Sequence, residues 1–582
     1  MNCLHDHLQA NVKIEKVSAE SNQELLEQEY HPIRIHFDMS GFLEREDSKM
    51  CKRVGQTVSW EFGTLKCTKN DLMDDDKMKV LSETLDNLGK YISKLVSVKR
   101  SVNPINVKPF RDFNVSEKKY FTDLVVCVTL RPFEPEKKTL GAAFCTKTGV
   151  EGRPILSGMY INPSYIPNET QNELSLKKTF FHTLFHELIH SMGFSSSMFP
   201  LWINKETGKK YNPFPLQKYT NPKYPSKVFS ILQTPAARKF IYDRFGITEF
   251  APGVKSGIEL EDGGGSGVVL SHPESRVYLS EVMCGIFVGY CYVSKLTLAV
   301  LDDMGWYQVN YSMADLYPWG DGRSLGKQHL SNFINSPPQI AYPKHYLCWD
   351  DTPASICNYD HLSKGYCSPN ETFDCDKNNE DYRCKIKMFA NPKNQKLWGS
   401  RSEFDYLFFK VPNVSLRCDD ESNNNIKTDD EYYGKESMCA MSTITSNNPV
   451  PKCYKMICTN QNQLNIYVGN VSKQCFNENQ EITFDNYQGK IICPNPNIIC
   501  NMKSFFKLPK TDLSELPKIN QTETQSKINI INLCKLMFVF IEISICCFCC
   551  IINISENRDN DDYLLESTEQ NELVEMETND NL

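Results

Sequence analysis

A short histidine motif offers the clearest chemistry in this sequence. His186, Glu187 and His190 form an HExxH pattern inside the apolar stretch SLKKTFFHTLFHELIHSMGF. Side chains four residues apart lie on one face of a helix, so both imidazoles can bind a single metal ion, with Glu187 beside them as a general base. The chain has only 11 histidines, which makes a chance match rare. His182, one turn earlier, is interpreted as a packing or supporting residue rather than a ligand.

Two histidines leave a catalytic zinc ion one protein ligand short, because such ions usually have three. Four histidines lie downstream as candidates: His272, His329, His345 and His361. Glycines precede His272 and would allow a close approach of the backbone. Met283, which follows it, is either an apolar floor beneath the metal or an ordinary core methionine.

The elements that would position these residues can be traced by periodicity. Residues 71–100 carry apolar residues at steps of three and four, with aspartates at the start and basic residues at the end, which predicts an amphipathic helix. The HExxH stretch predicts a second helix that stops near Gly193. Strands are expected at 32–38, 124–130 and 156–161, a loop-rich region at 196–260, and a helix at 296–303. This order predicts an α+β domain.

The cysteines indicate an oxidising compartment. The chain has 24, of which 18 lie between Cys51 and Cys500, an even number that fits a disulfide framework. Cys51–Cys67 and Cys493–Cys500 are plausible local pairs. Seven N-x-S/T triplets before residue 536 agree with export and glycosylation; they begin at Asn114, Asn168, Asn310, Asn370, Asn413, Asn470 and Asn520.

An apolar run near the end of the chain predicts one membrane span. Residues 536–552, LMFVFIEISICCFCCII, form a short transmembrane candidate with an acidic tail after it. The flanking charges oppose an outside N-terminus, but the cysteines and glycosylation triplets favour it. No apolar signal opens the sequence, so the chain is expected to begin inside a longer gene product.

The charge balance argues against nucleic acid as a partner. The net charge is -8 with a pI of about 5.9, so phosphates are not generally attracted. The GGGSG run at 263–267 lacks the lysine of a phosphate-binding loop.

Three segments together resemble the leishmanolysin family of surface metallopeptidases, which belongs to the metzincins. They read HELIHSMGF, SHPESRVYLSEVM and TLAVLDDMGWYQVNYSMADLYPWG, and the likeness extends over about residues 3–500. The resemblance implies one zinc ion held by His186, His190 and His272, with Glu187 as general base and Met283 in the Met-turn.

The resemblance also implies latency. The family has a propeptide cysteine within a CxHD signature, and CLHD here places it at Cys3, where its thiolate can exclude the attacking water from the metal. Two departures stand out: DGRSLGKQH after Trp319 lacks a family cysteine, and Pro273 after the third histidine is atypical. Neither removes a ligand.

These observations predict a zinc-dependent endopeptidase that acts on protein and peptide substrates outside the cell or in a lumen. The alternative is a catalytically inactive surface protein that binds or adheres through its Cys-rich region. The fold class expected is α+β, a metzincin core followed by a Cys-rich, mostly β or irregular domain. The expected segments are a propeptide remnant at 1–28, an N-terminal catalytic subdomain at 29–195, a central subdomain at 196–330, a Cys-rich domain at 331–505, a stalk at 506–533, a transmembrane helix at 534–554 and an acidic tail at 555–582.

Overall fold

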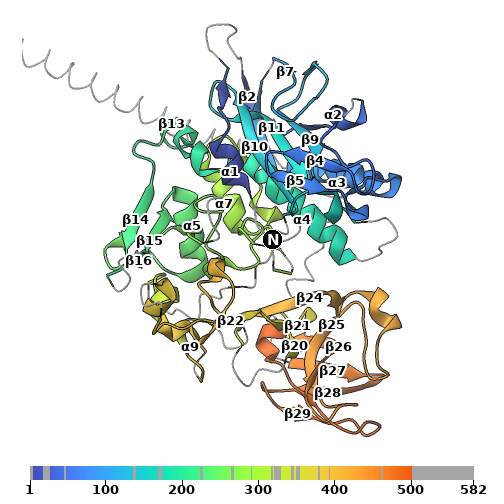
Figure 1. Cartoon of the computed structure of the whole chain (residues 1–582). Coiled ribbons are helices and arrows are strands. Elements are labelled where there is room, and N and C mark those ends of the chain that lie inside the picture. Colours follow the sequence, from blue (N-terminus) through green and yellow to red (C-terminus); the bar gives the residue numbers. More distant parts are fainter. Residues whose placement is uncertain are drawn as a thin grey trace, which may run out of the picture. The chain divides into compact units, whose positions relative to one another are not determined.

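A five-stranded mixed sheet forms the centre of the N-terminal half (Figure 1). The computed structural model describes residues 4–500 except 18–25, 45–46, 102, 135–138, 168–173, 223–226, 264–267, 287, 290, 316, 318, 320–328, 343–345, 349–353, 378–380, 392 and 461–462. The strand order is β1 (Glu15–Lys16), β10 (Gly141–Thr148), β11 (Pro154–Ile161), β9 (Leu124–Leu130) and β3 (Ile35–Asp38). Strands β9 and β11 are buried along their whole length, as expected for strands covered on both faces.

Two long helices pack on this half. Helix α3 (Asp75–Leu95) begins where the Asp74 side chain accepts a hydrogen bond from the Lys77 N–H, and it buries the apolar face that its spacing predicts. The predicted helix to residue 100 is too long, because the β-branched Val96 starts strand β6 (Val96–Ser101). Helix α4 (Leu174–Ser191) packs against β10 and β11. Strand β6 lies between β2 (Leu26–Pro32) and β19 (Gln308–Val309).

Residues 196–260, which were predicted to be rich in loops, contain more regular secondary structure than expected. They contain helix α5 (Pro235–Phe245), which ends at the left-handed Gly246, and the sheet β14 (Leu216–Thr220), β15 (Val228–Leu232) and β18 (Ile258–Leu260). Helix α7 (Lys295–Asp303) lies where the periodicity predicts it. Smaller elements complete these regions: α1 (His5–Ala10), α2 (Ser40–Leu43), α6 (Ser275–Tyr278), α8 (Asn332–Asn335), α9 (Pro338–Ala341), β4 (Thr57–Trp60), β5 (Gly63–Lys66), β7 (Ile105–Val107), β8 (Lys118–Tyr120), β12 (Ile203–Asn204), β13 (Lys209–Lys210), β16 (Glu249–Ala251) and β17 (Val254–Lys255).

The C-terminal half is a set of strands joined by disulfides. A six-stranded sheet has the order β28 (Val471–Cys475), β27 (Gln463–Val468), β26 (Val450–Asn460), β25 (Ser437–Ser442), β30 (Ile491–Ile492) and β29 (Glu481–Ile482). Two smaller sheets consist of β20 (Ser355–Cys357), β21 (Ser363–Cys367) and β24 (Lys410–Arg417), and of β22 (Asn370–Thr372) with β23 (Leu397–Gly399). The predicted fold class, α+β with a Cys-rich C-terminal domain, is confirmed.

The disulfides correct one predicted pair. Cys51–Cys67 forms as expected. Cys493 does not pair with Cys500, because β28 and the strands after it bring Cys475 to Cys493, and Cys500 pairs with Cys458. Four of the 18 framework cysteines are unpaired and buried: Cys127, Cys145, Cys284 and Cys291. The seven bridges among the described residues indicate an oxidising environment outside the cell or in a lumen.

Several predictions fall outside the described residues. They are the candidate switch Cys3, the stalk at 506–533, the transmembrane segment at 534–554 and the acidic tail at 555–582. Within the part of the chain that the structure describes, no helix has the length and apolar character needed to cross a membrane.

Candidate metal centre

Helix α4 carries the first two histidines one turn apart. Its apolar side chains Leu184, Phe185, Leu188 and Ile189 are fully buried, which fixes the helix beneath the sheet. The helix ends just before Gly193, whose positive φ of 115° lets the chain reverse. This reversal brings the Phe194 carbonyl back to His190, whose Nδ1–H donates to it at 2.7 Å.

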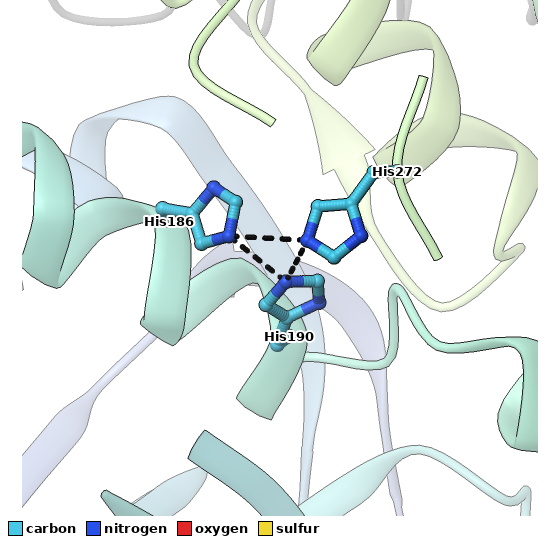
Figure 2. A group of neighbouring side chains, drawn as sticks. All are labelled: His186, His190 and His272. Carbon is cyan, nitrogen blue, oxygen red and sulfur yellow. Dashed lines mark hydrogen bonds between the residues drawn. The ribbon is translucent and has the colours of Figure 1, made fainter. Parts of the chain in front are cut away.

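The loop after β18 supplies the third histidine. The Nε2 atoms of His186, His190 and His272 lie 3.1, 3.0 and 3.3 Å from one another (Figure 2). All three residues are at most 1% exposed. The structure therefore joins the three histidines although His272 is 82 residues beyond His190.

Main-chain carbonyls orient all three rings. The Nδ1 atoms of His186, His190 and His272 each lie 2.7 Å from a carbonyl oxygen, of Val282, Phe194 and Val268 respectively. A carbonyl only accepts hydrogen bonds, so each Nδ1 carries the hydrogen and each Nε2 presents a lone pair. Three lone pairs that converge at this distance repel one another unless a cation lies among them.

The donor set fits zinc. Nitrogen ligands placed about 2.0–2.1 Å from a tetrahedral zinc ion lie roughly 3.3–3.4 Å apart, close to the spacing of these Nε2 atoms. Metal binding needs neutral imidazoles. Burial lowers the pKa of His186 to about 4 and the pKa values of His190 and His272 well below the usual value, so all three are neutral at physiological pH.

Glu187 is buried beside this cluster. Burial has the larger influence on the pKa of its carboxyl, which is raised to about 8. A hydrogen bond from the Ala143 N–H on β10 acts in the opposite direction and favours the ionised form. Its Oε2 has no hydrogen-bond partner among the residues described. Strand β10 approaches closely here, since a Cβ built on Gly141 would lie 3.5 Å from the Glu187 Cγ. An orphaned buried carboxylate oxygen is costly, and beside the three histidines it makes Glu187 a candidate for a chemical role.

Met283 is fully buried in the turn that supports His186. It follows Val282, whose carbonyl accepts the hydrogen bond from His186 Nδ1. Gly285, which the sequence reasoning missed, packs against the third histidine: a Cβ there would lie 2.1 Å from Val268 Cγ1 and 3.5 Å from His272 Cγ. In the sequence, the glycine that follows Met283 and Cys284 could have indicated this close approach.

Comparison with known proteins identifies the family. Residues 2–504 match the sequence profile described as leishmanolysin. The chain belongs to the leishmanolysin family. It is 28% identical over 315 residues to a leishmanolysin-like peptidase of Caenorhabditis briggsae, covering 47% of this chain and 46% of that protein.

The names of two further relatives point to the same family. The leishmanolysin-like peptidase of Drosophila melanogaster is 25% identical over 62% of this chain and 60% of its own length, and leishmanolysin of Leishmania chagasi is 25% identical over 54% and 50%. The chain thus spans about half of the length of several curated relatives that it matches. The leishmanolysin family consists of zinc-dependent metallopeptidases.

The other histidines lie elsewhere. His329 lies near Glu249, with Nδ1 to Oε2 at 3.6 Å, and His361 Nδ1–H donates to the Cys439 carbonyl. His345 lies outside the described residues. His182 is half-buried, contacts the Phe181 ring and is not among the three clustered imidazoles.

Helix α1, from the predicted propeptide remnant, covers the cluster. The His5 ring stacks on His190 with centroids 4.0 Å apart, and its Nδ1–H donates to the Ala143 carbonyl. Asp6 accepts hydrogen bonds from the hydroxyls of Ser196 and Ser271, the residue before the third histidine. The CLHD motif pointed to this segment, but only through Cys3; the contacts of His5 and Asp6 were not predicted.

Proposed function

We propose that this leishmanolysin-family chain is a zinc endopeptidase in which His186, His190 and His272 hold one zinc ion and Glu187 is the general base. The convergence of three Nε2 lone pairs in a buried site carries the proposal. A bound zinc ion would supply Lewis-acid polarisation and acidify water. The substrates we propose are proteins or peptides outside the cell or in a lumen.

The chain's own groups would handle the proton. Glu187 Oε2, which has no donor in this structure, would take a proton from the attacking water and deliver it to the leaving nitrogen. The Ala143 N–H would keep the carboxylate oriented during both transfers. The three carbonyls at Val282, Phe194 and Val268 would keep the imidazoles in the ligand tautomer.

We also propose that α1 keeps the site latent, with Cys3 as the candidate metal-blocking thiolate. The stacking of His5 on His190 and the contacts of Asp6 support this role. The alternative of an inactive adhesive protein is not favoured, because all three histidines and the glutamate are present and the imidazoles converge.

Substitution of the base tests the proposal. Glu187→Ala should keep one zinc ion per chain, because no ligand is removed, and should lower the hydrolysis of casein by on the order of 10²–10⁴-fold. Zinc content and turnover are measured on the chain after removal of α1. His182→Gln is the control on the same helix and should keep both properties. Turnover by Glu187→Ala equal to that of the control would refute the assigned base.

A further inference from the structure

A second cluster of ionisable side chains lies at the foot of the loop that carries His272. It contains five carboxylates and two cations, all among the described residues: Glu259, Glu261, Asp262, Glu274, Asp405, Lys227 and Arg276. Glu259, Glu261 and Glu274 are at most 1% exposed. Buried charges are costly unless they are paired, so this excess of negative charge needs a counter-charge.

The two cations form close ion pairs with only some of the carboxylates in this cluster. Arg276 donates from Nε to Asp405 at 2.7 Å and from Nη2 to Glu259 at 2.5 Å. Lys227 contacts Asp405 and lies 3.1 Å from Asp262 Oδ1. Among the described residues, Glu261 receives hydrogen bonds only from uncharged groups, the Gly263 and Ser275 N–H and the Ser275 hydroxyl.

Three of the carboxylates, including Asp262 with its one oxygen near Lys227, lie close to one another. One oxygen each from Glu261, Asp262 and Glu274 lies within 4.8 Å of the others. Asp262 Oδ2 and the deeply buried Glu274 Oε2 have no hydrogen-bond partner in the part of the chain that the structure describes. Glu274 Oε1 accepts only the Arg276 N–H, and its nearest cation, Arg276 Nε, is 4.0 Å away. An orphaned, buried carboxylate oxygen among other carboxylates is the arrangement that a cation completes.

We propose that Glu261, Asp262 and Glu274 bind a calcium ion, separate from the histidine centre. Oxygen-only ligands favour a hard cation, whereas the three imidazoles favour zinc. Calcium accepts irregular carboxylate geometry better than magnesium, which requires a near-ideal octahedron and retains waters. An oxidising, extracellular or lumenal setting also supplies calcium at concentrations that weak sites can use.

The position of this site gives the ion a structural role. The Glu261 N–H donates to the His272 carbonyl and the Glu274 N–H to the Glu259 carbonyl, both at 2.9 Å, so the cluster closes the base of the loop from 261 to 274. An ion bound there would tie the two ends of this loop together. Its binding is independent of the proposed peptidase reaction, since it requires neither zinc nor Glu187.

The test measures calcium binding on the full chain, with zinc supplied and Glu187→Ala introduced to prevent self-digestion. Calcium alone is titrated by calorimetry, and the midpoint of thermal unfolding is followed. We expect one calcium ion per chain and a rise in the midpoint of about 3–8 °C at a concentration near one hundred times Kd. Glu274→Gln, which keeps the shape and the Oε1 acceptor, should abolish both effects.

Matched variants separate the site from general damage. Glu281→Gln alters another carboxyl that is 1% exposed and has an orphaned Oε2, but it lies outside the cluster and should keep the calcium response. Asp262→Asn, at a half-buried position, replaces Glu274→Gln if that variant does not fold. An unfolding midpoint that ignores calcium and rises as the pH falls below neutrality would overturn the proposal, because protons would then neutralise the cluster.

Discussion

The imidazole nitrogens of the metal centre are oriented by main-chain carbonyls rather than by side chains. His186 and His190 could be predicted as a pair because helical spacing alone places them on one face. His272 could not be selected from the residues alone, since its approach depends on the fold of the 81 intervening residues and three other histidines competed. The carbonyls of Val282, Phe194 and Val268 leave no mark in the sequence, because every residue carries a carbonyl.

Gly285 offers a test at this scale. Gly285→Ala would press a Cβ against Val268 Cγ1, at 2.1 Å in the present backbone, and Val268 is the residue whose carbonyl holds His272. We expect zinc affinity to fall by roughly 10–100-fold, as for losses of groups that orient metal ligands. The measurement is competition for zinc with a chelator of known affinity.

A second glycine supplies the control for this prediction. In helix α3, a Cβ on Gly89 would lie 3.6 Å from Phe37, an ordinary contact. Gly89→Ala should therefore leave zinc affinity unchanged and stabilise the helix by about 1 kcal/mol. Equal zinc affinities in the two variants would show that the close approach at Gly285 does not support His272.

At the scale of elements, the spacing of apolar residues predicted an element correctly where its apolar pattern is clear, and missed an element where the pattern is weak. Helix α3 and strand β9 were predicted from their apolar residues, and both elements bury these residues. Strand β10 was missed because GAAFCTKT mixes small and polar residues. This omission matters, because β10 is the strand of the sheet that α1 contacts, and it contributes the Ala143 groups that contact Glu187 and His5.

The proposed latency can be tested at the contact of α1 with β10. The Gln9 side chain forms two hydrogen bonds with the main chain of Cys145, as a neighbouring strand would. Its Nε2–H donates to the Cys145 carbonyl at 3.1 Å, and its Oε1 accepts from the Cys145 N–H at 2.8 Å. Each such hydrogen bond contributes about 0.5–1.5 kcal/mol, so Gln9→Ala should raise the activity of the unprocessed chain by roughly 5- to 150-fold. The readout is peptide hydrolysis before any cleavage of the segment.

Asn11→Ala is the matched control for the Gln9 variant. The Asn11 amide donates only to the His7 carbonyl within the same segment and is exposed. It should leave the basal activity of the unprocessed chain unaltered. If Gln9→Ala were no more active than Asn11→Ala, the contacts of α1 with β10 would not contribute to latency.

Across the whole described chain, stability comes from different sources in the two halves. The N-terminal half has one disulfide, Cys51–Cys67, and a continuous apolar core around the five-stranded sheet. In the C-terminal half, one buried cluster consists of four half-cystines and Tyr433. The cysteine count predicted a disulfide framework, but the pairing depends on strand order, which the Asn- and Asp-rich sequence there does not specify.

Reduction should therefore unfold the C-terminal half first. Six disulfides lie between Cys348 and Cys500, and each contributes about 2–4 kcal/mol, so their sum is comparable to or larger than the roughly 5–15 kcal/mol that stabilises a typical domain. After mild reduction and brief trypsin treatment of the Glu187→Ala chain, mass spectrometry should find cleavage within 348–500 before cleavage within α3, β9 or β11. The unreduced chain, treated in parallel, should resist trypsin in both halves. Early cleavage of β9 or β11 would mean that the N-terminal core depends on Cys51–Cys67, and that the apolar sheet does not sustain this half by itself.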